Sequence, residues 1–244
     1  MKVEIWSDIA CPWCYIGKRR FEKALRGFEH AAEVSVAWRS FELDPASPPV
    51  REGDPTRALA AKYGISVEQA ADFQARMTRA AAEEGLSFDF SALRPGNTFD
   101  AHRLLHLAGE LGRGDKLHER LFAAYLCEGQ AIGDRGVLAR LAEESGIDAE
   151  RARNLIGSDT YGDRVRAEEQ EAAELGISGV PFFVIDRTYG LSGAQPSDRI
   201  LAALRQAWAE RPRSVPVQVR GDSEGETASC EDGRCNVPAR GGSR

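Results

Sequence analysis

Cys11 and Cys14 are the residues whose types and spacing point most directly to chemistry. They stand three positions apart in Cys11-Pro12-Trp13-Cys14. A helix that begins at Cys11 has Pro12 at its first position, where the missing N–H costs nothing. The helix dipole then favours a thiolate at Cys11, and Cys14 lies one turn further along the same face. This arrangement suits thiol–disulfide exchange, with Cys11 as the attacking thiol and Cys14 as the resolving one.

A metal site is the alternative reading of this pair. Zinc held by four cysteines would need Cys230 and Cys235, which form the other closely spaced pair. A pair fixed at a helix start is a poor half of a tetrahedral site, so we expect no metal and no cofactor. His102 and His106 are one turn apart but lack a third ligand, and packing is the better interpretation. We expect Cys127 to be a small buried apolar residue without a role.

Composition bounds the class of protein and its partners. The chain has 244 residues, 42% of them hydrophobic, which is enough for one elaborated domain or two small ones. A net charge of −6 argues against nucleic acid, and no basic run or long apolar run suggests a membrane. A short strand pattern with Glu4 and Asp8 follows Met1 and Lys2 directly, so we expect no secretory h-region, and the number and spacing of the five cysteines do not resemble a dense disulfide framework. We therefore expect a cytoplasmic protein.

Residues 1–55 predict the first part of an α/β core. A short apolar strand from Val3 to Trp6 precedes the dithiol helix, which continues in amphipathic fashion to about Phe28. Residues 34–41 alternate apolar and polar side chains, as a second strand parallel to the first would. Prolines and a glycine between residues 43 and 55 then indicate an exposed connection.

Residues 56–176 predict an all-helical insertion. Ser66 to Gln69 form a capping box, and later Asn97 and Gly176 mark a helix start and a helix stop. The expected helices are 66–84, 97–111, 115–126, 134–145, 148–156 and 160–175. Residues 177–209 return to the core with a strand over 177–186, a hairpin partner over 189–193 and a last helix over 196–208. Polar composition over 210–244 predicts a flexible C-terminal tail that carries Cys230 and Cys235.

Four segments in this order resemble the DsbA family. They are SDIACPWCYIGKRRFE, NTFDAHRLLHLA, ELGISGVPFFVID and LSGAQP, and the likeness spans about residues 2 to 209 and is closest to the FrnE-like branch. The resemblance implies a thioredoxin-like α/β fold with a large helical insertion. It also implies that Val180-Pro181 is the cis-proline segment beside the dithiol. Pro12, Trp13, Val180 and Pro181 would then bind substrate, a substrate strand pairing with the backbone there.

The same resemblance suggests roles for three further residues. FrnE-like proteins carry a second, four-spaced cysteine pair, so Cys230 and Cys235 would exchange with the first pair through a tethering tail. They could equally be unpaired thiols or a local disulfide without function. Glu4, on the strand running into the site, is a candidate acid–base assistant for the resolving cysteine, although an exposed strand glutamate is as good an interpretation.

The residues together predict a thiol–disulfide oxidoreductase or isomerase. Its partners would be proteins or small molecules with thiols or disulfides, with glutathione or a thioredoxin-type protein as a reductant. Trp13 stands where DsbA has a histidine, so we expect a less oxidising disulfide than in DsbA. Glutathione-dependent 2-hydroxychromene-2-carboxylate isomerases and kappa-class transferases resemble the chain too, but they generally have serine in place of Cys11. A holdase that uses the apolar surface around Trp13 and Pro181 is a third class.

Overall fold

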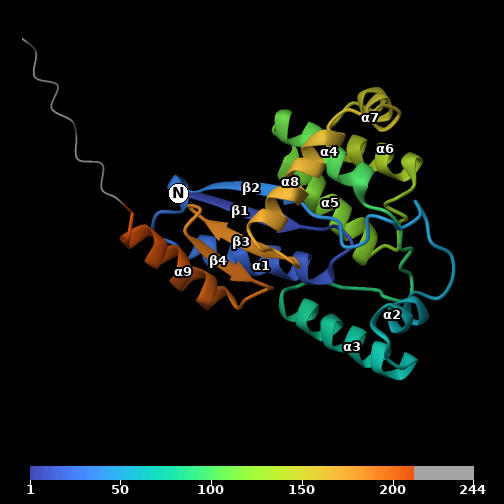
Figure 1. Ribbon diagram of the computed structural model, residues 1–244, viewed down its shortest axis with the longest axis horizontal. Coiled ribbons are helices and arrows are strands. Elements are labelled where there is room, and N and C mark those ends of the chain that lie inside the picture. The colour runs from blue at the N-terminus through green and yellow to red at the C-terminus, as the bar shows by residue number, and fades with distance from the viewer. Residues whose placement is uncertain (212–244) are drawn as a thin grey trace, which may run out of the picture. The chain divides into compact units, whose positions relative to one another are not determined.

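A four-stranded sheet with the strand order β2-β1-β3-β4 lies at the centre of the computed structural model, which describes residues 1–211 (Figure 1). The strands are β1 (Lys2–Ser7), β2 (Ser35–Ser40), β3 (Phe182–Ile185) and β4 (Tyr189–Ser192). β1 pairs with β2 in parallel, which confirms the pairing predicted from the sequence, and it pairs with β3 in antiparallel fashion. β2 and β4 are therefore the two edge strands.

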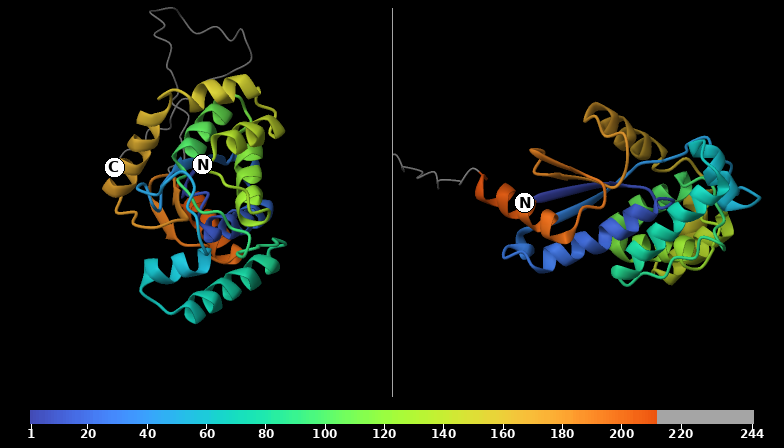
Figure 2. Two further views of the ribbon diagram at one scale, coloured as in Figure 1. Left: turned by 90° about the vertical axis from the view of Figure 1, so that its right-hand side faces the viewer. Right: turned by 90° about the horizontal axis from the view of Figure 1, so that it is seen from below.

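Helices cover both faces of the sheet (Figure 2). On one face, α1 (Pro12–Arg26) and α9 (Ser197–Ala209) pack against Val3, Ile5 and Phe183. On the other face, α8 (Gly162–Glu174) packs against Trp6 and Val184. Successive residues of a strand point to opposite faces, so β1 supplies a side chain to each layer in turn.

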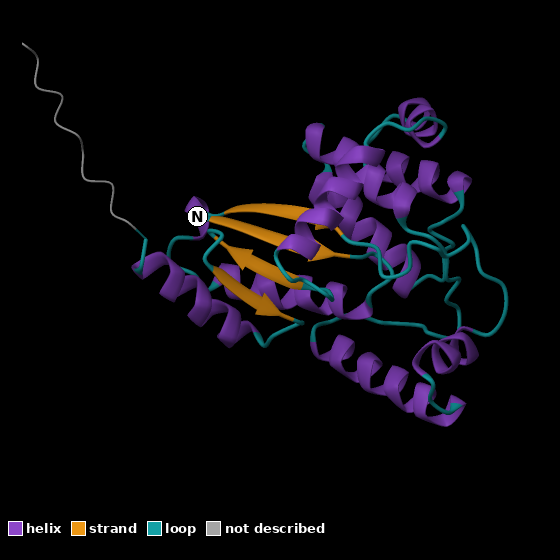
Figure 3. Ribbon diagram, viewed as in Figure 1, coloured by secondary structure: helices purple, strands orange, loops and turns teal. Residues whose placement is uncertain are grey.

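The remaining helices come between β2 and α8 in the chain, as Figure 3 shows by colour. They are α2 (Pro55–Tyr63), α3 (Val67–Glu83), α4 (Phe99–Glu110), α5 (Gly114–Leu126), α6 (Arg135–Glu144) and α7 (Ala149–Ile156), and a single 3-10 turn, Ala31–Glu33, precedes β2. The capping box predicted at Ser66 and Gln69 is confirmed at the start of α3. None of the helices within residues 1–211 has the length and apolar character that crossing a membrane requires.

Helix α2 is an element that the periodicity does not predict. Asp54 caps it by accepting hydrogen bonds from the backbone N–H of Thr56 at 2.8 Å and of Arg57 at 3.3 Å. Pro55 is its first residue, and Gly64 ends it in the left-handed conformation with φ 64°. An Asp-Pro start and a Gly stop are a recognisable helix signature, which the neighbouring prolines obscure.

The strand predicted over residues 177–186 is much shorter in the structure. β3 begins only at Phe182, after Pro181, because proline has no N–H to donate to a ladder. The residues before it form a loop that passes the N-terminus of α1, where the dithiol lies.

Helix α1 joins two hydrophobic cores. Its first turns place Cys14, Tyr15 and Ile16 in a cluster with residues of α4, α5 and α6. Its later turns place Phe21 and Ala24 in the core between the sheet and α9. The start of α1 is therefore fixed by the helical insertion, and its end by the sheet.

Candidate active site

The dithiol lies at the junction between β1 and α1. Cys11 caps the helix with extended backbone angles, φ −93° and ψ 111°, and Pro12 is the first helical residue. The Cys11 N–H donates to the carbonyl of Asp8, and the Cys14 N–H donates to the carbonyl of Cys11, both at 3.0 Å. Among the described residues no side chain caps α1, so the positive end of the helix dipole acts on the Cys11 side chain without a competing acceptor.

The two sulfurs differ in their environment. Cys11 has 5% of its surface exposed and Cys14 none, and both are free thiols. Burial raises the pKa of the Cys14 thiol, and the neighbouring Cys11 raises it further. The Asp8 backbone and the Ser7 hydroxyl act in the opposite direction and favour the Cys14 thiolate. Both thiols are thus buried, but Cys11 keeps a small solvent-accessible area, and Cys14 is the one that is held protonated behind it.

Val180 and Pro181 face the dithiol from the loop before β3. The peptide bond between them is cis. The Cys11 Sγ donates to the Val180 carbonyl at 3.5 Å. A Cβ on Gly17 would lie 2.9 Å from Pro181 Cγ, so a glycine at this place in α1 lets the proline ring approach the helix. The structure thus brings together Cys11, Cys14 and the two residues of the proline segment.

A cavity of about 230 Å³ opens beside Cys11. Pro12 and Trp13 line it from α1, and Arg51 and Lys62 contribute positive charge. The rest of its wall is mainly apolar and comes largely from α2, α3 and the loops around them; it includes Leu43, Leu59, Tyr63, Phe73, Met77, Phe90 and Leu93. Cys11 is therefore exposed to a concave apolar surface, the kind of surface that binds small molecules or side chains.

Glu4 lies away from the dithiol. It is opposite Val184 in the sheet, on the face that α8 covers, and is 1% exposed. Burial alone would raise the pKa of Glu4, but hydrogen bonds from Arg187 and Arg39 lower it to about 2. Within residues 1–211 it makes no hydrogen bond or ion pair with either cysteine. This position argues against the acid–base role expected for Glu4.

The other predicted residues fall in different places. His102 is buried in α4, and His106 lies one turn on, 3.4 Å from the carboxylate of Glu168. Cys127 is half-buried at the end of α5, where burial raises its pKa. In the described part of the chain, no group of three or more His, Cys, Asp or Glu residues could hold a metal ion. Cys230 and Cys235 lie outside the described residues.

Sequence reasoning missed Asp8. Its side chain is 1% exposed and accepts hydrogen bonds from the N–H of Leu43 at 2.7 Å and of Ala10 at 3.2 Å. His102 Nε2 lies 3.5 Å from Asp8 Oδ1. Burial disfavours the charged form of His102, but Asp8 favours it, and the pKa of His102 is raised. An aspartate in an apolar stretch three residues before a dithiol was the available signal.

A dithiol at the start of the helix that follows a central strand, opposite a proline loop, defines a thioredoxin-fold protein with a helical insertion. The family model of the DsbA-like thioredoxin domain matches residues 2–205. The chain therefore belongs to the DsbA-like thioredoxin family.

Known proteins agree with this assignment. The Bacillus subtilis protein YwbO is 32% identical over 198 residues, which cover 80% of this chain and 92% of YwbO. The crystal structure of a probable DsbA oxidoreductase from Streptomyces coelicolor is 48% identical with a TM-score of 0.84, and the match covers 87% of this chain and 92% of that one. The cytosolic disulfide reductase DsbM from Pseudomonas aeruginosa shares the fold at 19% identity, with a TM-score of 0.60 over 86% of this chain and 99% of that one.

Proposed function

We propose that this protein catalyses thiol–disulfide exchange through Cys11 and Cys14. The observation that carries the proposal is the difference between the two thiols: Cys11 lies at the N-cap position of α1 and keeps 5% of its surface exposed, whereas Cys14 is fully buried one turn further along the helix. Cys11 attacks a substrate disulfide and forms a mixed disulfide. Cys14 then attacks Cys11, the Cys11–Cys14 disulfide forms and the reduced substrate leaves.

The surroundings of Cys11 support a substrate with an apolar group beside its sulfur. Trp13 and Pro12 line the cavity at Cys11, and the Val180 carbonyl lies 3.5 Å from the Cys11 sulfur. A substrate strand that pairs at Val180 and Pro181 would bring its own sulfur to Cys11. Both protein and small-molecule thiols meet these requirements.

The compartment and the redox partner are part of the proposal. We place the protein in the cytoplasm, where paired cysteines are more often redox-active than structural. Glutathione or a thioredoxin-type protein would return the Cys11–Cys14 disulfide to the dithiol. A DsbM structure from Pseudomonas aeruginosa contains glutathione, which makes glutathione the first reductant to test.

The test compares wild type with Cys11→Ser and Cys14→Ser in insulin reduction and in oxidation of a dithiol peptide. We expect Cys11→Ser to be inactive in both and Cys14→Ser to accumulate a mixed disulfide at Cys11, detectable by mass spectrometry. A glutathione-conjugation assay runs beside them. Conjugation that survives in Cys14→Ser without disulfide turnover in wild type would instead favour the glutathione-dependent isomerase or transferase class. Suppression of aggregation without any turnover would favour a holdase.

We further propose that Cys230 and Cys235 exchange with the first pair. The tail would act as a tether that raises the effective concentration of the second dithiol at Cys11. A Cys230→Ser/Cys235→Ser variant should recover more slowly from the oxidised form under limiting glutathione. Unchanged turnover and unchanged recovery would contradict this relay while leaving the role of Cys11 and Cys14 intact.

A further inference from the structure

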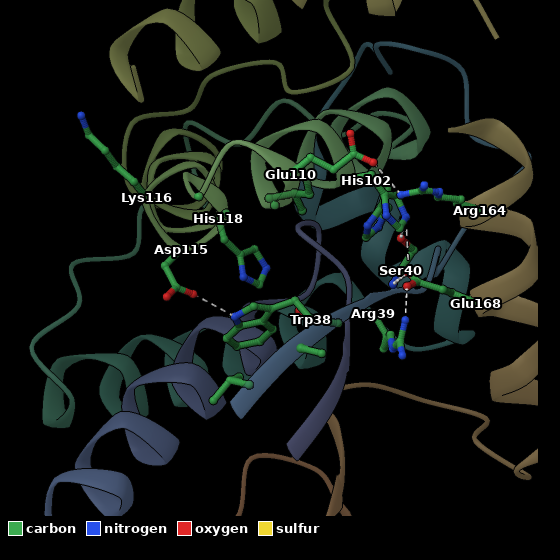
Figure 4. A pocket seen from close by; sticks show the side chains of 18 residues that line it. Trp38, Arg39, Ser40, His102, Glu110, Asp115, Lys116, His118, Arg164 and Glu168 are labelled. Atoms are coloured by element: carbon green, nitrogen blue, oxygen red, sulfur yellow. Dashed lines mark hydrogen bonds and ion pairs between the residues drawn. The ribbon is translucent and has the colours of Figure 1, made fainter. Parts of the chain in front are cut away.

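A second cavity, called the rear cavity below, lies along the edge strand β2 (Figure 4), and neither Cys11 nor Cys14 lines it. Its volume is about 700 Å³, and its walls come mainly from β2, α4 and the start of α5. Ser7, the last residue of β1, and the histidines His102 and His118 line it. In Figure 4, Trp38 lies on β2 below His118.

Unpartnered buried polar atoms are concentrated in this cavity. Ser7 Oγ, His102 Nε2 and His118 Nδ1 are the three buried side-chain nitrogen and oxygen atoms of residues 1–211 that make no hydrogen bond, although the Asp8 carboxylate lies 3.5 Å from His102 Nε2. All three residues line the cavity, and each is at most 2% exposed. A buried polar group without a partner costs about 1–3 kcal/mol, so such a concentration calls for an explanation. A polar cavity of this size admits water.

Ser7 and Asp8 connect this cavity to the resolving thiol. Ser7 ends β1 directly before Asp8, whose carbonyl accepts the Cys11 N–H at 3.0 Å. The Asp8 backbone and the Ser7 hydroxyl, which makes no hydrogen bond of its own, are the groups that favour the Cys14 thiolate. The Asp8 carboxylate lies 3.5 Å from His102 Nε2. Asp8 also lines the smaller cavity beside Cys11, whereas His102 lines the rear cavity. The Asp8–His102 pair therefore spans the wall between the two cavities.

The exchange reaction needs a route for the Cys14 proton. Cys14 is fully buried, burial raises its pKa, and a substrate joined to Cys11 covers the front of the site. The protonated thiol is a poor nucleophile, so its proton must leave before Cys14 can attack. Cys11 lines the smaller cavity and not the rear one, so we expect the rear cavity to stay free when substrate is bound at Cys11.

Several charged or titratable groups face His102 and Asp8 from the surrounding elements. Burial works against the charged form of His102, but Asp8, Glu42 and Glu169 raise its pKa. From α5, His118 has its pKa lowered far below the usual range by burial, with Lys18 and His102 adding to the effect. Tyr125, also from α5, is affected by Asp8, although burial is the main reason that its pKa is raised. Asp8, whose carboxylate lies 3.5 Å from His102 Nε2, raises the pKa of His102 more than the other carboxylates do.

We propose that the Asp8–His102 pair accepts the Cys14 proton through the Ser7 hydroxyl and the solvent of the rear cavity. The inference rests on the proposed exchange reaction. The Cys14 S–H bond breaks and its proton passes to His102, the thiolate attacks the Cys11 sulfur, the Cys11–Cys14 bond forms and the substrate leaves as a thiolate. Cys11 and Cys14 are oxidised, and the substrate disulfide is reduced. His102 then returns the proton to cavity water. Asp8 and His102 are positioning residues, because neither side chain touches a reacting sulfur.

The aromatic disulfide 5,5′-dithiobis(2-nitrobenzoate) separates the two steps. Attack by Cys11 releases a first coloured thiolate, and attack by Cys14 on the mixed disulfide releases a second. The experiment uses the full chain with Cys127→Ala, Cys230→Ser and Cys235→Ser, so that Cys11 and Cys14 are its only thiols. In this background we expect His102→Ala to slow the second release at pH 7 by at least about tenfold, since general base catalysis contributes about 10²–10⁴-fold. The first release should change less than about twofold.

Two readouts distinguish proton transfer from a packing defect. Imidazole added to His102→Ala should accelerate the second release, because the cavity of about 700 Å³ admits it. The parent rate of the second release should rise with pH as His102 becomes neutral, and His102→Ala should lose that rise. His106→Gln is the matched control: His106 lines the same cavity from the same helix but contacts Ser40 and Glu168.

The outcomes separate this inference from the proposed function. Absence of the first release in the parent protein would overturn the exchange reaction itself. A normal first release with an unchanged second release in His102→Ala, or equal slowing of both releases with no response to imidazole, would overturn the proton route alone. If circular dichroism finds His102→Ala unfolded, Ser7→Ala carries the test: a slower second release supports the route and an unchanged one overturns it.

Discussion

At the scale of single residues, the side chain between the cysteines sets how strongly the disulfide oxidises. Trp13 is half-buried and lines the cavity at Cys11, where an imidazole would lie close to the thiolate at the helix start. A cation there stabilises the thiolate, which favours the dithiol over the disulfide. The tryptophan offers no such charge.

Trp13→His should therefore make the Cys11–Cys14 disulfide more oxidising, by about 30 mV or more, since about 30 mV corresponds to a tenfold change in the equilibrium constant. Equilibration with glutathione at fixed pH measures this shift. Trp13→Phe is the control and should keep the potential within about 10 mV. A potential that moves equally in both variants would assign the effect to lost packing of the indole instead of to charge.

At the scale of elements, the approach of the proline loop to α1 depends on one glycine. A Cβ on Gly17 would meet the ring of Pro181 at 2.9 Å, and a proline ring cannot rotate aside. The loop would have to move away from α1, and with it the Val180 carbonyl that lies 3.5 Å from the Cys11 sulfur.

Gly17→Ala should lower the free energy of unfolding by about 1–3 kcal/mol, the usual cost of overpacking, and slow insulin reduction several-fold. Urea unfolding and the turnover assay measure the two effects. Gly109→Ala in α4 is the matched control, because a Cβ there meets nothing within 4 Å. It should be neutral or stabilise by up to about 1 kcal/mol. Equal behaviour of the two variants would contradict the close approach at Pro181.

The elements also show what the sequence could predict. Periodicity and capping residues predict the helices that begin near Ser66, Asp134 and Asp148, because their signals are local. The strand before Phe182 is predicted too long, since apolar composition alone does not show where a ladder ends. Within the site, the spacing of the cysteines predicts the dithiol, but Asp8 meets His102 across more than ninety residues of sequence. No local pattern encodes such a contact.

At the scale of the whole molecule, an ion-pair network joins the sheet to its covering helix. Arg39 on β2 bonds Glu4 on β1 at 2.5 Å and Glu168 on α8 at 2.7 Å. Arg187, from the turn between β3 and β4, bonds Glu4 as well. Two buried carboxylates thus link four segments of the chain: β1, β2, α8 and the turn between β3 and β4.

This network predicts how stability depends on pH. Burial would raise the pKa of both Glu4 and Glu168, but hydrogen bonds lower each pKa to about 2. Arg187 and Arg39 donate these bonds to Glu4, whereas His106, the Ser40 N–H and Arg39 donate them to Glu168. Both folded-state values lie below the ordinary 4.5, so the stabilisation is complete above pH 4.5 and is lost as the pH falls toward 2. Allowing for solvent around the exposed Arg187, each carboxylate contributes on the order of 2 kcal/mol to the free energy of unfolding at neutral pH.

The urea midpoint should therefore fall as the pH is lowered from 4.5 to about 2, between the ordinary and the folded-state pKa of the two carboxyls. Glu168→Gln should lower stability at pH 7, because it leaves Arg39 without one of its two carboxylates, and should flatten the acid dependence. Glu29→Gln is the control, since Glu29 pairs with Arg205 at the surface, and surface pairs contribute little. An acid profile that Glu168→Gln leaves as steep as in wild type would mean that other carboxylates, and not the link between the sheet and α8, govern acid unfolding.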